Sequence, residues 1–252
     1  MDALCINQED KVEKKAQVAR MHEIYTQAEM VCIWLGEGTP ETPETFTFLQ
    51  TILNLRSLDN LVKSPISQDT ARKWALVVDL MANRWFSRRW ILQELALSRQ
   101  ATVKWGDNEL HWVDFADAIA LFMTKYEDIK RQCLDIVGKY KETDARALGA
   151  HTIVHTMINL FRKSQDGLVE QRLIPLEILV SSLLLAFEAS EPRDTIFAVL
   201  TLAKDSHSTH AGPIATGDER ISPDYEKCLL DVYTDFMDYC ITKSKSLDII
   251  CR

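Results

Sequence analysis

The sequence lacks the cysteine spacing that builds disulfide frameworks or zinc sites. No two cysteines form a Cys-x-x-Cys pair, and no signal sequence precedes them. The six cysteines are Cys5, Cys32, Cys133, Cys228, Cys240 and Cys251. Small disulfide-bonded secreted proteins and structural zinc sites use closely spaced cysteines. We therefore expect reduced thiols and no bound metal.

The sequence also lacks a basic excess and a long apolar run. Lys and Arg total 29 against 37 for Asp and Glu, which gives a net charge of -8. Proteins that bind nucleic acid or anionic lipid need a basic face. The most apolar stretch, residues 173–187, is interrupted by Pro175, Glu177 and two serines, whereas a membrane-spanning helix needs about 20 apolar residues. These absences predict a soluble, cytoplasmic protein with no nucleic-acid or membrane partner.

What the sequence does contain is a globular composition with alternating helices and strands. Of the 252 residues, 46% are hydrophobic and 26% are charged, close to the globular average. An amphipathic pattern at 10–28 predicts a helix. Apolar runs at 30–35 and 101–105, each closed by glycine, predict buried strands of a parallel sheet. Together with helices expected at 68–81 and 90–99, this order is typical of a doubly wound α/β fold.

Strands become scarce after residue 111, and the second part is predicted to be mainly helical. The helical patterns lie at 112–125, 148–161, 175–187, 192–203 and 224–242. A polar loop is expected between the last two. We therefore divide the chain into an α/β core at 1–110 and a helical C-terminal part at 111–252.

Trp90 and Glu94 form the densest candidate for chemistry. They stand four residues apart, so a helix places the indole and the carboxylate on the same face. An aromatic ring beside an acid suits a ring-bearing substrate on which positive charge develops. The same spacing also fits a purely structural pair, in which Trp90 packs in the core and Glu94 makes a salt bridge. Spacing by itself favours the structural interpretation.

Two further groups of polar residues have both a functional and a structural interpretation. Arg84, Arg88 and Arg89 are clustered, which fits either binding of nucleotide phosphates or a solvated arginine face. Pro192 and Asp194 resemble the start of a helix, with the carboxylate near the positive end of the helix dipole. For Asp194 we prefer helix capping together with an ion pair.

Several segments resemble the central motifs of the fungal heterokaryon incompatibility (HET) domain. The first three are residues 2–8, 33–36 and 86–95, which read DALCINQ, IWLG and FSRRWILQEL. The segment at 191–200 resembles the Pro-Arg-Asp helix of the same family, and residues 221–225 together with 232–236 resemble its closing helix. The motifs occur in the family's order and run from residue 2 to about residue 250.

The resemblance implies a role in fungal non-self recognition and programmed cell death. HET domains are similar in layout to TIR domains, which have a flavodoxin-like parallel sheet. In catalytic TIR domains a Trp-x-x-x-Glu helix supplies the glutamate that cleaves NAD, and Trp90 with Glu94 matches that pattern. The resemblance thus implies Glu94 as the catalytic acid and Trp90 as the wall against nicotinamide, with Asn7 and Gln8 binding polar groups at the mouth of the site. Arg89, from the arginine cluster, is a further candidate binding residue. NAD would be a substrate, with no resident cofactor.

The family normally carries a strand and a helix before the DALCINQ motif, and the sequence starts at Met1-Asp2. We therefore expect a TIR-like sheet that misses its first strand. Two alternatives to an NAD-cleaving enzyme follow. One is a signalling module that acts by self-association or through a partner HET or sensor protein, and the other is an inactive, truncated relative. For Asn7 and Gln8, turn chemistry at the end of a strand is the alternative to binding.

Overall fold

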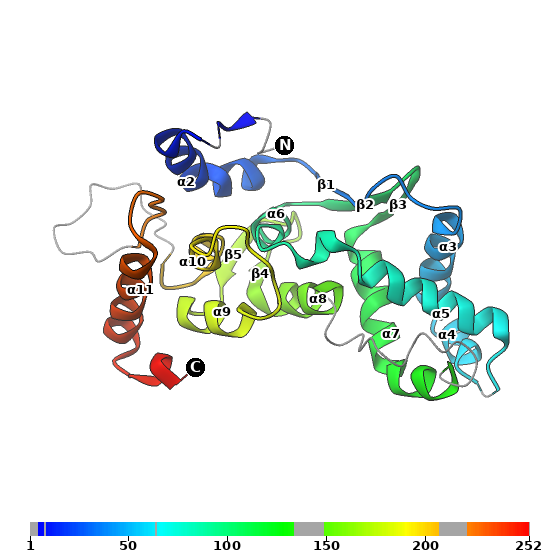
Figure 1. The fold of residues 1–252 in the computed structure, drawn as a ribbon. Helices are drawn as coiled ribbons and strands as arrows, with labels where there is room; N and C mark the ends of the chain where they lie inside the picture. Colours follow the sequence, from blue (N-terminus) through cyan, green and yellow to red (C-terminus); the bar gives the residue numbers. More distant parts are fainter. Residues whose placement is uncertain (1–4, 8, 64, 134–148, 207–220, 252) are drawn as a thin grey trace. The chain divides into compact units, whose positions relative to one another are not determined.

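The computed structural model describes residues 5–7, 9–63, 65–133, 149–206 and 221–251 (Figure 1). The chain forms two compact units, each built from separate segments. Unit 1 takes residues 1–29, 89–99 and 159–252, and unit 2 takes residues 30–88 and 100–158. The predicted mixture of helices and strands is confirmed. The division at residue 110 stays a prediction, and both units contain residues from each side of it.

Unit 2 contains a three-stranded sheet in the order β1-β2-β3. Strands β1 (Val31–Trp34) and β2 (Ala101–Trp105) pair in parallel, as expected, with Ile33 opposite Val103. Strand β3 (Asn108–His111) pairs antiparallel with β2 and was not predicted. It follows a tight turn in which Gly106 has a φ of 57°. The Gly-Asp dipeptide at this turn is a hairpin signal.

The helices of unit 2 enclose an aromatic core beside the sheet. They are α3 (Thr42–Ile52), α4 (Leu55–Leu61), α5 (Gln68–Met81), the 3₁₀ helix η1 (Arg84–Ser87), α7 (Trp112–Cys133) and α8 (Gly149–Leu160), whose residues up to Ile158 belong here. Trp74 of α5 is fully buried. Its ring meets Phe48 edge to face at 4.8 Å and stacks on Phe122 at 5.5 Å, measured between ring centroids. This packing joins α3, α5 and α7.

Unit 1 combines the N-terminal helix, the short helix that follows Trp90, and most of the C-terminal part. Its elements are α2 (Lys11–Gln27), α6 (Ile91–Ala96), β4 (Phe161–Lys163), β5 (Val169–Arg172), α9 (Leu176–Leu183), α10 (Asp194–Phe197), η4 (Leu200–Leu202), α11 (Leu229–Ser244) and η5 (Asp248–Cys251). Asp10 caps α2 by accepting hydrogen bonds from the amides of Val12 and Glu13, which satisfies two donors that a helix start leaves free.

Three details of unit 1 differ from the sequence expectation. The antiparallel hairpin β4–β5 lies in the part predicted to be helical. The helix expected at 90–99 ends at Ala96, and the one expected at 192–203 is divided into α10 and η4. Within the described ranges, no helix has both the length and the apolarity that crossing a membrane requires.

Candidate functional site around Trp90

Trp90 and Glu94 lie one turn apart where α6 begins. Trp90 is the residue before the first turn of α6, and its carbonyl accepts a hydrogen bond of 3.3 Å from the Glu94 amide. Both side chains are half-buried. Just before Trp90, the Arg89 amide donates to the carbonyl of Glu188 at 2.9 Å, which anchors the start of the segment. The backbone therefore has the one-turn separation that the spacing predicts.

The indole of Trp90 is bonded to a buried carboxylate that is distant in sequence. Its Nε1–H donates to Oδ2 of Asp194 at 2.9 Å. The other carboxylate oxygen, Oδ1, accepts a hydrogen bond of 2.7 Å from the hydroxyl of Tyr225. Asp194 is 7% exposed and Tyr225 is 5% exposed. One carboxylate thus joins a residue before α6, the first residue of α10 and the loop before α11.

The electrostatics of this cluster follow from its burial. Burial raises the pKa of the Asp194 carboxyl, and the hydrogen bonds from Tyr225 and Trp90 oppose that rise, as does the positive charge of Lys14. Burial and the adjacent carboxylate both raise the pKa of the Tyr225 phenol. Tyr225 therefore remains a hydrogen-bond donor across the neutral pH range.

A small pocket lies beside the cluster. It has a volume of about 70 Å³ and is lined by Ile6, Lys14, Val18, Met21, Trp90, Asp194 and Tyr225. The Lys14 ammonium stands over the Tyr225 ring, 4.5 Å from its centroid. A volume of this size holds about two water molecules. The pocket thus brings Trp90 together with Asp194, and Glu94 is not among its described lining residues.

Arg89, predicted as a nucleotide-binding residue, is buried and bonded to backbone. Its side chain is 1% exposed, and Nη2 donates to the carbonyls of Leu183, Leu184 and Phe187 at 3.0, 3.2 and 3.1 Å. These carbonyls lie at and just beyond the C-terminal end of α9, where the helix dipole favours a cation. Burial lowers the pKa of the guanidinium. The geometry gives Arg89 a structural role, and a role toward phosphate stays a prediction.

Asn7 makes the turn contacts that were the alternative to ligand binding. Its Oδ1 accepts a hydrogen bond of 3.1 Å from the Glu9 amide, and its own amide donates to Oε1 of Glu13 at 3.4 Å. Such contacts are typical of the turn that leads into a helix. Gln8 lies outside the described residues. Binding of a ligand by Asn7 or Gln8 therefore stays a prediction.

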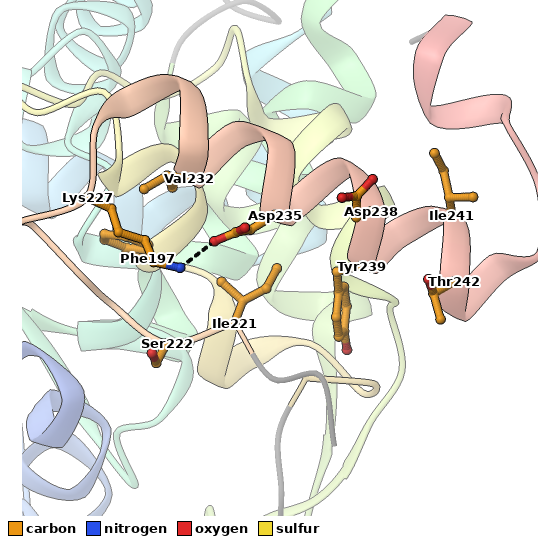
Figure 2. A pocket seen from close by; sticks show the side chains of 10 residues that line it. All are labelled: Phe197, Ile221, Ser222, Lys227, Val232, Asp235, Asp238, Tyr239, Ile241 and Thr242. Carbon is orange, nitrogen blue, oxygen red and sulfur yellow. Dashed lines mark hydrogen bonds and ion pairs between the residues drawn. The ribbon is translucent and has the colours of Figure 1, made fainter. Parts of the chain in front are cut away.

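A larger pocket in unit 1 contains none of the predicted site residues. It has a volume of about 550 Å³ and borders α11, with Lys227 and Asp235 forming an ion pair of 2.6 Å at its wall (Figure 2). Its remaining lining residues are Phe197, Ile221, Ser222, Val232, Asp238, Tyr239, Ile241 and Thr242. The described residues include no group of three His, Cys, Asp or Glu side chains that could hold a metal ion.

Comparison with known proteins identifies the segment that contains Trp90 and Glu94. Residues 1–94 match the family described as heterokaryon incompatibility protein (HET). We call residues 1–94, which are similar to that family, the HET segment. It is also similar to heterokaryon incompatibility protein 6, OR allele, of Neurospora crassa, with 30% identity over 125 residues. That match covers 38% of this chain and 18% of the relative, so the chain spans only a small part of that protein. No solved structure matches the chain.

The HET segment does not by itself contain the partners of Trp90. Asp194 and Tyr225 both follow residue 94, yet they form the two hydrogen bonds that define the cluster. The sequence offered a signal for both, since they lie in the segments that resemble the Pro-Arg-Asp and closing motifs. Asp194 was expected at a helix start, and it is the first residue of α10, although the N-cap residue Arg193 makes no side-chain cap bond. The Asp194 carboxylate is used by Trp90 and Tyr225, while the neighbouring Arg193 pairs with Glu191 at 2.6 Å.

Proposed function

We propose that this chain acts in fungal heterokaryon incompatibility, as part of a non-self recognition response that kills fused cells. The observation that carries the proposal is the HET match over residues 1–94. The similarity to a Neurospora crassa protein named for heterokaryon incompatibility supports it. The names describe the matched family and the relative. The role that they indicate is our hypothesis for this chain.

We further propose that Glu94 cleaves the bond between nicotinamide and ribose in NAD, within a TIR-like layout. Support comes from the one-turn spacing of Trp90 and Glu94 and from the parallel pairing of β1 with β2. As the N-glycosidic bond breaks, its electron pair leaves with nicotinamide and the ribose develops oxocarbenium character. The Glu94 carboxylate stabilises that positive charge, and water then adds to give ADP-ribose. The pocket of about 70 Å³ is far smaller than NAD, so the dinucleotide would bind outside it, at the half-buried Glu94.

The second candidate is a signalling module without catalysis. The hydrogen bond already made by the Trp90 indole favours it. The indole N–H of Trp90 already donates to Asp194 at 2.9 Å, and the adjoining pocket has a volume of only about 70 Å³. A tryptophan used in this way stabilises unit 1 whether or not a substrate binds. In this case the chain would signal by assembly with itself or with a partner HET or sensor protein.

The substitution Glu94→Gln separates the two candidates. If Glu94 is the catalytic carboxylate, the neutral amide no longer stabilises the developing charge. Nicotinamide release from NAD should then fall about a hundredfold or more. The measurement is nicotinamide released from NAD by the purified chain, together with cell death in hyphae that express it.

The matched control is Glu170→Gln, which changes an exposed carboxylate of β5 in the same unit. It should leave both measurements unchanged. Cell death that persists undiminished in Glu94→Gln would establish the assembly candidate. The absence of nicotinamide release from the unaltered chain at high protein concentration would exclude NAD cleavage by this chain.

A further inference from the structure

Both carboxylate oxygens of the buried Asp194 accept hydrogen bonds from neutral donors. Asp194 accepts from the Trp90 indole at 2.9 Å through Oδ2 and from the Tyr225 hydroxyl at 2.7 Å through Oδ1. A buried carboxylate is costly unless it is hydrogen-bonded, and bonds to an ionised group are stronger than those between neutral groups. The Trp90 indole is therefore held by one of the stronger kinds of hydrogen bond available to it.

The basic side chains near Asp194 are directed elsewhere in the described part of unit 1. Arg193 donates to Oε1 of Glu191 at 2.6 Å and to the carbonyl of Lys227 at 2.9 Å. The Lys14 ammonium lies over the ring of Tyr225, 4.5 Å from the centroid. Asp194 itself is the acidic residue in the first turn of α10. Within the described residues, the Asp194 carboxylate accepts side-chain hydrogen bonds from the indole and the phenol and forms no ion pair within 4.0 Å.

The Trp90 side chain is fixed at both ends by this arrangement. Its backbone is held at the start of α6, where its carbonyl accepts from the Glu94 amide. Its indole N–H is held by Asp194, whose other oxygen is held by Tyr225. Two attachment points restrict both side-chain torsions of a tryptophan. The orientation of the Trp90 ring is therefore set by residues more than a hundred positions further along the chain.

We infer that Asp194, oriented by Tyr225, is a positioning residue that fixes the Trp90 indole at the start of α6, one turn before Glu94. The catalytic consequence rests on the proposed NAD cleavage, whereas the effect on the indole does not. If nicotinamide packs against Trp90, a free indole widens the wall of the site and weakens substrate binding. Loss of Asp194 then reduces kcat/KM mainly through KM, while loss of Glu94 reduces kcat.

The test uses the full chain labelled with ¹⁵N, in which the indole signal of Trp90 is identified by its loss in Trp90→Phe. In Asp194→Asn the Trp90 indole proton should change its chemical shift and exchange with solvent about tenfold faster, because a bond to a charged acceptor is lost. Tyr225→Phe is the milder variant and should cause a smaller change in the same direction. Nicotinamide release by Asp194→Asn should show about a tenfold higher KM for NAD.

Two control variants are matched in chemistry. Asp238→Asn changes an exposed carboxylate of α11 at the wall of the larger pocket (Figure 2). Tyr233→Phe removes a hydroxyl that donates to the Pro192 carbonyl at 3.2 Å and not to Asp194. Both should leave the Trp90 indole signal in place.

The outcomes separate the positioning role from the proposed function. An unmoved Trp90 signal in folded Asp194→Asn overturns the positioning role, whatever the effect on NAD. A displaced signal with an unchanged KM also overturns it, because the indole would then be free without consequence. A displaced signal in a chain that never releases nicotinamide supports the link between Asp194 and Trp90 and rejects NAD cleavage.

Discussion

At the residue scale, the polar groups of Trp90, Arg89 and Asp194 stabilise the fold through hydrogen bonds to distant segments of the chain. The three residues differ in charge, yet each is bonded to a group far away in the sequence. A buried polar atom without a partner costs about 1–3 kcal/mol. Two nitrogens of Arg89, Nε and Nη1, have no partner within the described residues. The hydrogen bonds from Nη2 to three backbone carbonyls are therefore what stabilises the buried guanidinium.

We predict that Arg89→Met destabilises the chain by about 2 kcal/mol. Methionine keeps much of the apolar stem but removes the donor shared by the carbonyls of Leu183, Leu184 and Phe187, and unsatisfied buried carbonyls are unfavourable. The measurement is the urea midpoint of unfolding at unchanged slope. Arg162→Met, at an exposed position of β4, should shift the midpoint little. An Arg89→Met chain as stable as the unaltered chain would show that these bonds are not stabilising.

At the element scale, short elements in this protein are placed by contacts with neighbours. Helix α6 spans Ile91–Ala96, too short to be stable by itself in water. The same applies to α10, which spans Asp194–Phe197. In unit 2, the start of α8 lies against η1, since a Cβ added to Gly149 would overlap the backbone carbonyl of Phe86. A glycine at that point allows the close approach of two backbones.

We predict that Gly149→Ala destabilises unit 2 by about 2 kcal/mol, although alanine favours helices more than glycine does. The added methyl group meets backbone, which cannot move aside as a flexible side chain can. Thermal unfolding followed by circular dichroism measures the loss. Ser57→Ala, at a half-buried position of α4, should provide a reference with a smaller effect, limited to the first turn of that helix. An increased melting temperature in Gly149→Ala would contradict the close packing of α8 on η1.

The elements also show what periodicity predicts and what it misses. The strands at β1 and β2 and the helices α2 and α5 were predicted because each has an apolar pattern of sufficient length. The hairpin β4–β5 was missed because β4 spans only Phe161–Lys163, with two exposed residues, so that no alternation is readable. Its turn contains Gly167 with a φ of 76°, and a glycine alone is a weak local signal. Long amphipathic patterns are informative, and short exposed strands are not.

At the scale of the whole molecule, the path of the chain divides the HET segment between the two units. Residues 1–29 and 89–94 belong to unit 1, and residues 30–88 belong to unit 2. Unit 1 is completed by residues 159–252, which supply Asp194, Tyr225 and the carbonyls bound by Arg89. The matched segment therefore lacks much of the environment of its own Trp90.

We predict that a fragment of residues 1–94 has no cooperative unfolding transition, whereas the full chain does. In the fragment Arg89 and Trp90 lose their hydrogen-bond partners, and β1 loses its partner strand β2. Urea titration followed by tryptophan fluorescence measures the difference, with the 252-residue chain as the control. A cooperative transition in the fragment would show that the HET segment folds without the C-terminal part.

The sequence by itself determined the family resemblance, the alternation of helices and strands in the first part, and the one-turn spacing of Trp90 and Glu94. These features depend on residues close together in the chain, where backbone geometry relates spacing to position. Only the tertiary structure decided that Trp90 bonds to Asp194, that Arg89 binds the end of α9, and that Tyr225 completes the cluster. Those contacts join segments about thirty to a hundred residues apart, and no local pattern encodes which buried donor meets which acceptor.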